Sequence, residues 1–241
     1  PMPHPTMLQA KNNNPLIELL VTIVIPSVIL MKFSGEADLG AVRALLLALA
    51  FPLAWGTLDW VRRKKLNLFA ALGLVSILLT GGIGLLELDR HWLAVKEAAI
   101  PGLIGLAVVL SAPTRYPLVR TLLYNPALID VERVRQHLEA RGTTQAFEAR
   151  LRAANLLIGG TFCSAAAMNY LLATWIVTSP AGSAAFNEEL GRLTLVSYPM
   201  IAIPSMLMML AVLYGLARAL RDLAGLKLME VFNQPGDRHE P

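Results

Sequence analysis

The chain has 241 residues, of which 55% are hydrophobic and 16% charged, and its mean hydropathy is +0.55. This composition excludes an ordinary water-soluble domain, because a globular core of this size cannot hide so much apolar surface. The net charge of +4 comes from basic residues that lie between apolar blocks, which favours contact with anionic lipid head groups. The sequence has no basic strip interleaved with aromatic residues, so it does not indicate a nucleic acid partner.

Apolar blocks recur along the chain at about the length that crosses a hydrocarbon core of roughly 30 Å. They predict an all-α membrane protein, a bundle of about six transmembrane helices. The predicted spans are 15–31, 39–61, 66–88, 92–112, 153–177 and 194–216. A polar segment, 1–14, precedes the first span, and an amphipathic tail, 217–241, follows the last.

The placement of Lys and Arg predicts the orientation of these spans, because cytoplasmic loops retain positive charge during insertion. With both termini in the cytoplasm, sixteen of the 21 basic residues lie on that side and five on the other. The orientation is therefore predicted to be N-in and C-in. The basic side chains expected to contact lipid head groups are Arg62, Arg63, Lys64, Lys65, Arg115 and Arg120.

The predicted cytoplasmic loop 113–152 is too long for a simple connector. Val131, Val134 and Leu138 recur in it at helical spacing among charged residues, which predicts a short amphipathic helix. The preceding stretch 115–123 alternates apolar and basic residues. It either lies on the membrane surface or continues the fourth helix into the cytoplasm.

Three of the predicted spans have short uncharged runs, of 13 residues in the first and 15 in the second and the fourth. A run of about 20 residues is needed to cross unaided, so flanking charges must enter the membrane. These are Glu18 and Asp59 toward the inner side, and Arg43, Lys96 and Glu97 toward the outer side, where Glu87 also lies. A charge at the bilayer centre costs at least ~2.5 kcal/mol, so we expect the first, second and fourth helices to line the interior.

Two interpretations of these polar residues remain open. They line a hydrated cavity, an ion path or a lipid head-group pocket, or they reach the interface and form a structural ion pair such as Lys96 with Glu87. Asn169 and Tyr170 in the fifth span add two polar side chains. The amide of Asn169 either hydrogen-bonds across helices or contacts a ligand.

Small residues in the fifth span indicate close helix packing. Gly159, Cys163 and Ala167 repeat every four residues, and Gly160 with Ser164 forms a neighbouring pair. The chain has one cysteine, and its four histidines are scattered over termini and loops. We therefore predict no metal site, no cofactor and no catalytic residues.

Several short motifs occur in the order found in a known family. They are Arg62-Arg63-Lys64-Lys65 before a helix with Gly81-Gly82, Trp92 with Lys96, Pro117-Leu118 before Leu122-Leu123, and Ala167, Asn169 and Tyr170 in the fifth span. Over at most two thirds of its length, centred on 59–177, the chain resembles the intracellular septation protein A family of bacterial inner-membrane proteins. It is longer at the N-terminus and in the arginine-rich loop.

The resemblance implies a multi-pass protein of the bacterial inner (plasma) membrane that supports cell envelope integrity or septation. Its expected partners are membrane lipids, division or envelope proteins, and further copies of the chain. The leading hypothesis is a scaffold or lipid-associated factor. The alternative is a transporter of a small molecule, ion or lipid through a polar cavity lined by helices one, two and four, and a membrane-embedded enzyme comes third.

Overall fold

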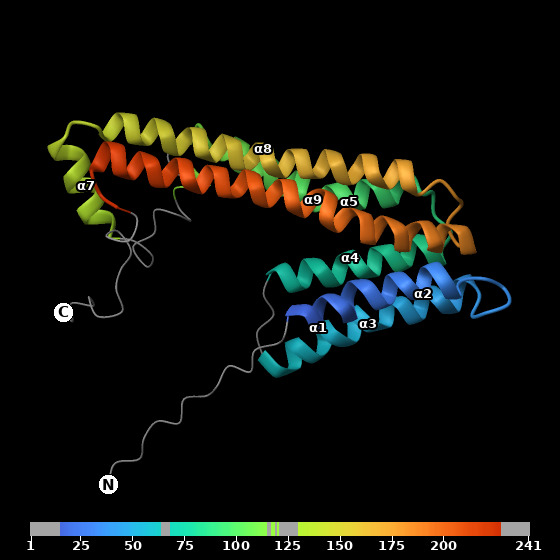
Figure 1. Cartoon of the computed structure of the whole chain (residues 1–241). Coiled ribbons are helices and arrows are strands. Elements are labelled where there is room, and N and C mark those ends of the chain that lie inside the picture. The colour runs from blue at the N-terminus through green and yellow to red at the C-terminus, as the bar shows by residue number, and fades with distance from the viewer. Residues whose placement is uncertain (1–14, 64–67, 115–116, 119, 121–129, 228–241) are drawn as a thin grey trace, which may run out of the picture. The chain divides into compact units, whose positions relative to one another are not determined.

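The computed structural model describes residues 15–63, 68–114, 117, 118, 120 and 130–227. Every regular element in these ranges is a helix (Figure 1), which confirms the all-α prediction. Five stretches are long and apolar enough to cross a membrane, as expected of a membrane protein: Leu16–Phe33, Ala41–Leu58, His91–Ser111, Thr144–Ile176 and Ala184–Ala224. The third predicted span corresponds to α4, Leu68–Leu85. The side chains of α4 are described only from Val75 on, and the apolar stretch Val75–Leu85 alone is too short to cross a membrane, so the count of six stays a prediction.

The chain divides into two compact units, each described by itself. Unit 1 consists of Pro1–Leu93 and Trp175–Val196, and unit 2 consists of Ala94–Thr174 and Ser197–Pro241. The helices α5, His91–Ser111, α8, Thr144–Ile176, and α9, Ala184–Ala219, contribute residues to both.

Unit 1 begins with one continuous helical segment of three parts, α1 (Pro15–Leu19), a π-helical turn η1 (Leu20–Val24) and α2 (Ile25–Phe33). The ring of a proline clashes with the carbonyl four residues earlier in an α-helix. Pro26 lies directly after the π turn, where the Ile25 N–H donates to the Leu20 carbonyl five residues back. The wider turn thus accommodates the proline without ending the helix. α3 (Ala41–Arg63) packs against α2 and α4, and the three lie side by side in Figure 1.

Glycines let the helices of unit 1 approach closely. A Cβ on Gly191 of α9 would lie 2.7 Å from the Ser27 carbonyl of α2, and one on Gly84 of α4 would lie 2.5 Å from Leu45 Cδ2 of α3. Phe186 at the start of α9 is fully buried. At Gly191 the helix therefore approaches the backbone of α2, and at Gly84 the backbone of α4 packs directly under the side chain of Leu45.

The helices α8 and α9 are longer than their predicted spans. α8 begins at Thr144 rather than at 153, and α9 begins at Ala184 rather than at 194. With 33 and 36 residues they measure about 50 and 54 Å at 1.5 Å per residue, well beyond a hydrocarbon core of about 30 Å. Residues 144–152 thus belong to α8 and not to the predicted loop 113–152, because the charges there end the apolar run without ending the helix.

A short helix, α7 (Val131–Ala140), lies within the segment where the sequence predicts an amphipathic helix. The carboxylate of Asp130 caps its start by accepting a hydrogen bond from the Arg133 N–H at 2.9 Å. At the end of α9, a π-helical turn η2 (Leu220–Ala224) terminates at Gly225 with φ +70°. The predicted tail 217–241 therefore begins as helix, and 228–241 lie outside the described residues.

α7 folds onto the ends of α8 and α9, as Figure 1 shows. The hydroxyl of Thr143 donates to the Leu223 carbonyl at 2.9 Å and joins the start of α8 to η2. The apolar faces of these elements form one buried cluster, consisting of Val134, Leu138, Phe147, Leu151, Ala219, Leu220, Ala224 and Leu226. We name this assembly, residues 130–152 and 216–227, the helical cap.

Candidate functional sites

The inner polar cluster predicted from Glu18 and Asp59 belongs to unit 1. Glu18 is exposed on α1, and its backbone carbonyl accepts a hydrogen bond from the Thr22 hydroxyl at 2.7 Å. Asp59 lies in α3, and its side chain is outside the described part of the structure. A polar cluster at this position stays a prediction.

Glu87 lies in the turn after α4, two residues beyond the end of that helix. Its φ of 51° is the left-handed value that non-glycine residues adopt only in special turns. Its side chain packs over Gly182, where a Cβ would lie 2.7 Å from Glu87 Cγ. Gly182 also has a positive φ, so glycine meets both requirements of this position. Glu87 therefore joins two loops of unit 1.

Lys96 and Glu97 form an ion pair on α5 of unit 2. The Lys96 Nζ is 2.6 Å from the Glu97 Oε1, and the two side chains are 10% and 30% exposed. A paired charge is far less costly in an apolar environment than a lone one. The predicted partner of Lys96 was Glu87, and both interpretations, a structural ion pair and a polar cavity or ion path, stay predictions.

Asn169 and Tyr170 lie on α8, where the sequence leaves open whether the amide crosses to another helix. The Asn169 amide donates to the Ala165 carbonyl of its own helix at 3.0 Å. Tyr170 is half-buried, and its backbone carbonyl accepts a hydrogen bond from Thr174. The ligand-contact role of both residues stays a prediction.

Asn155, which sequence reasoning did not single out, makes the cross-helix contact. Its side chain is fully buried, and its amide donates to the Val108 carbonyl of α5 at 2.6 Å and to the Ser111 hydroxyl at 3.3 Å. Both asparagines lie in the same apolar span.

The small residues of α8 pack against α5 as their spacing predicts. A Cβ on Gly105 of α5 would lie 2.8 Å from the backbone N of Cys163 and 3.1 Å from the Gly159 carbonyl. At the next turn Gly102 faces Ala166, with 3.5 Å between the two Cβ positions, so the contact involves Ala166 rather than Ala167. Gly160 faces open space, so the neighbouring small pair is not part of this interface.

The predicted head-group contacts are only partly described. Arg62 and Arg63 end α3 with side chains outside the description, and Lys64, Lys65 and Arg115 lie outside the described residues. Arg120 Nη1 is 3.6 Å from Glu148 Oε1, with both side chains nearly half exposed. Such a surface pair contributes little to stability.

The carboxylate of Glu189 holds the loop between α8 and α9. It accepts hydrogen bonds from the backbone N–H groups of Thr178 and Ser179 at 2.9 and 2.8 Å, and from both of their hydroxyls at 2.9 Å. Glu189 was not singled out in the sequence analysis. No local spacing rule identifies this contact, because the loop must first fold back onto α9.

A second missed residue, Asn187, lies one turn before the close α2 contact of Gly191. Its amide donates to the Ser34 hydroxyl at 3.1 Å and to the Ala41 carbonyl at 2.7 Å. Among the described residues, its Oδ1 and the hydroxyl of buried Ser27 have no hydrogen-bond partner. Asn187 therefore joins α9 to both ends of the α2–α3 loop.

The helical cap has a charged outer surface. Arg135 forms ion pairs with two glutamates. Its Nη2 is 2.7 Å from Glu132 Oε1, and its Nη1 is 2.8 Å from Glu139 Oε1. Hydrogen bonds from Arg135 and Gln136 lower the pKa of Glu132. The exposed charged residues of the cap are Glu132, Arg133, Arg135, Glu139, Arg141, Arg150, Arg152, Arg218, Arg221, Asp222 and Lys227.

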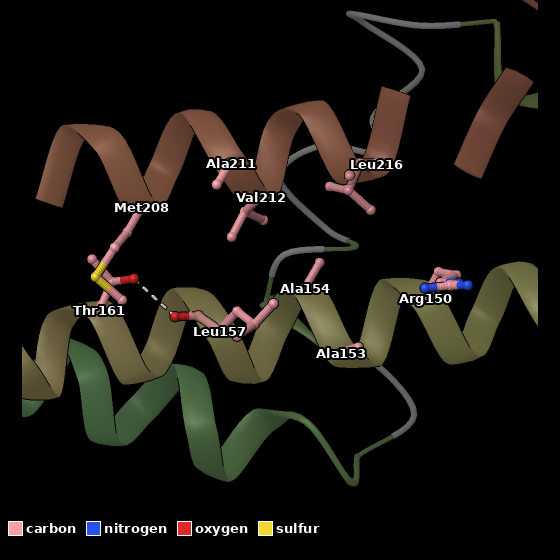
Figure 2. A pocket seen from close by; sticks show the side chains of 10 residues that line it. Arg150, Ala153, Ala154, Leu157, Thr161, Met208, Ala211, Val212 and Leu216 are labelled. Carbon is pink, nitrogen blue, oxygen red and sulfur yellow. Dashed lines mark hydrogen bonds between the residues drawn. The ribbon is translucent and has the colours of Figure 1, made fainter. Parts of the chain in front are cut away.

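An open apolar groove of about 260 Å³ lies between α8 and α9 within unit 2, below the cap (Figure 2). One residue of its lining is charged, Arg150, at the cap end. Thr161 lies at the other end, and its hydroxyl donates to the Leu157 carbonyl at 2.9 Å, so that its polarity is satisfied within the helix. The lining residues are Arg150, Ala153, Ala154, Leu157, Thr161, Met208, Ala211, Val212, Gly215 and Leu216.

These features define a helical membrane protein with a folded, charged cap and an apolar groove. Within the described ranges, no three side chains of the types His, Cys, Asp or Glu come together as metal ligands. No family model matches the chain, and neither a curated protein nor a solved structure matches it.

Proposed function

We propose that this chain is a multi-pass protein of the bacterial inner (plasma) membrane that supports envelope integrity or septation as a lipid-associated scaffold. The observation that carries this proposal is the helical cap. It is a folded surface with charges of both signs, built directly on two helices long enough to cross the membrane. Such a surface is suited to binding head groups and other proteins.

The packing of α7 argues for an exposed surface rather than a membrane anchor. An amphipathic helix that binds a bilayer needs a free apolar face to insert. In α7 that face is occupied, because Val134 is fully buried and Leu138 is 2% exposed within the cap. The charged face of α7 thus remains available for partners.

The proposed orientation places the cap in the cytoplasm. The arginines of the cap account for a large part of the sixteen basic residues on the proposed inner side. The resemblance to the intracellular septation protein A family supports division or envelope proteins as the partners there.

The proposal is tested by complementation of a deletion strain. We expect the deletion to raise sensitivity to osmotic downshift and to detergent, or to lengthen the cells, and the wild-type gene to reverse this. A cap variant with Arg133→Glu and Arg152→Glu should fail to complement at an equal membrane level. The control Arg90→Glu, an exposed charge reversal outside the cap, should complement.

Two results would overturn the scaffold proposal. One is a deletion strain with normal envelope and division. The other is a solute flux in proteoliposomes that is abolished by Glu18→Gln or Lys96→Gln, which would establish the transporter instead.

A further inference from the structure

The groove between α8 and α9 has the length of one membrane leaflet. Arg150 and Thr161 at its two ends are eleven residues apart on α8, which is about 16 Å of helix, or half of a hydrocarbon core of about 30 Å. Its α9 side runs from Met208 to Leu216 and covers a similar depth. A packing surface for another transmembrane helix would instead continue along the whole span.

Small residues on both helices form the floor of the groove, because their short side chains leave space between α8 and α9. Ala153 and Ala154 on α8 and Ala211 and Gly215 on α9 line the groove, and Figure 2 shows Ala154 pointing toward α9. Among the described residues, a Cβ on Gly215 would meet nothing within 4 Å, so this part of the structure leaves open space there. The lining offers van der Waals contact to a flexible hydrocarbon chain and satisfies no polar ligand along its length.

Arg150 gives the groove one charged end. Its side chain is exposed, and none of the described carboxylates lies within ion-pair distance of it. A guanidinium presents a planar fork of donors that matches a phosphate group and can bind it with two hydrogen bonds. An apolar groove one leaflet deep with a guanidinium at its interface end has the chemistry of a phospholipid.

We propose that this groove binds one anionic phospholipid, with an acyl chain between α8 and α9 and the phosphate at Arg150. The proposal depends on the membrane setting of the proposed function and not on the envelope role. Lipid binding is measured on the purified protein, whereas the envelope role is measured in cells. Failure of one is therefore distinguishable from failure of the other.

The test is native mass spectrometry of the full-length protein, delipidated in detergent and titrated with dioleoylphosphatidylglycerol. Wild-type protein should retain one lipid in preference to dioleoylphosphatidylcholine, and inorganic phosphate should not displace it. Arg150→Gln removes the charged contact and should weaken retention about tenfold. Gly215→Leu fills the groove and should abolish retention, and Ala211→Leu is a second filling variant should the first fail to fold.

The matched control is Gly160→Leu, because Gly160 also faces open space but does not line the groove. This variant should bind the lipid like the wild type. Equal loss of lipid in Gly160→Leu and Gly215→Leu would overturn the proposal, because the loss would then not depend on filling the groove. So would a Gly215→Leu variant that retains the lipid, and loss of a wild-type oligomer in this variant would assign the groove to a second copy of the chain.

Discussion

Substitution of Gly105 by alanine should destabilise unit 2, because α5 and α8 contact each other there through their backbones. The new Cβ would lie 2.8 Å from both the backbone N and the Sγ of Cys163, and 3.1 Å from the Gly159 carbonyl. A side chain can rotate away from such a contact, but a helix backbone moves only together with its neighbours. The two helices must therefore separate by several tenths of an ångström.

The size of the effect follows from two opposing contributions. Overpacking a close contact typically costs about 1–3 kcal/mol. Alanine in place of glycine favours the helix by up to about 1 kcal/mol. Gly160→Ala is the matched control, because this position on α8 gains the same helix preference and meets nothing within 4 Å. The preference cancels in the comparison, so Gly105→Ala should be less stable than Gly160→Ala by about 1–3 kcal/mol.

The assay is reversible unfolding of the purified protein in mixed micelles with increasing sodium dodecyl sulfate, followed by circular dichroism. The free energy of unfolding of each variant is compared under the same conditions. Equal stability of Gly105→Ala and Gly160→Ala would refute the close α5–α8 contact. A larger loss with Gly105→Leu than with Gly105→Ala would further support it.

Three further substitutions test individual contacts. Asn155→Ala should cost about 1–3 kcal/mol in the same unfolding assay, because it removes a buried cross-helix hydrogen bond, whereas Asn169→Ala should cost less than half as much. Glu189→Gln replaces one accepting oxygen of the carboxylate by a donor, so the amide hydrogens of Thr178 and Ser179 should exchange faster. Asp130→Ala removes the cap of α7 and should cost about 0.5–2 kcal/mol, seen as faster amide exchange in α7 alone.

Much of the fold follows from the periodicity and length of the apolar runs. Hydropathy predicts the membrane-crossing helices, and the spacing of Val134 and Leu138 predicts the apolar face of α7. The N-terminal starts of α8 and α9 were not predicted, because an apolar run in the sequence stops at the first charged residues. Arg150 and Arg152 continue the helix all the same, since helix hydrogen bonds need no apolar side chain.

The candidate sites were harder to predict than the helices. Gly159 and Cys163 were identified because small residues at four-residue spacing in a membrane helix usually mark a close helix–helix contact. Asn155, Asn187 and Glu189 were not, because each contacts residues between 10 and 153 positions away. Such partners depend on helix rotation and loop folding, which one sequence does not reveal. The groove likewise could not be predicted, because it forms only where α8 and α9 lie side by side.

Site-directed cysteine labelling tests the central claim, a cytoplasmic cap on helices that cross the membrane. With Cys163 replaced by alanine, the exposed Ala140 of α7 and Ala185 at the start of α9 are each changed to cysteine. A membrane-impermeant maleimide applied to intact spheroplasts should label Ala185→Cys at once and Ala140→Cys only after lysis. Labelling of both positions from the same side, or of the cap from outside, would contradict the account.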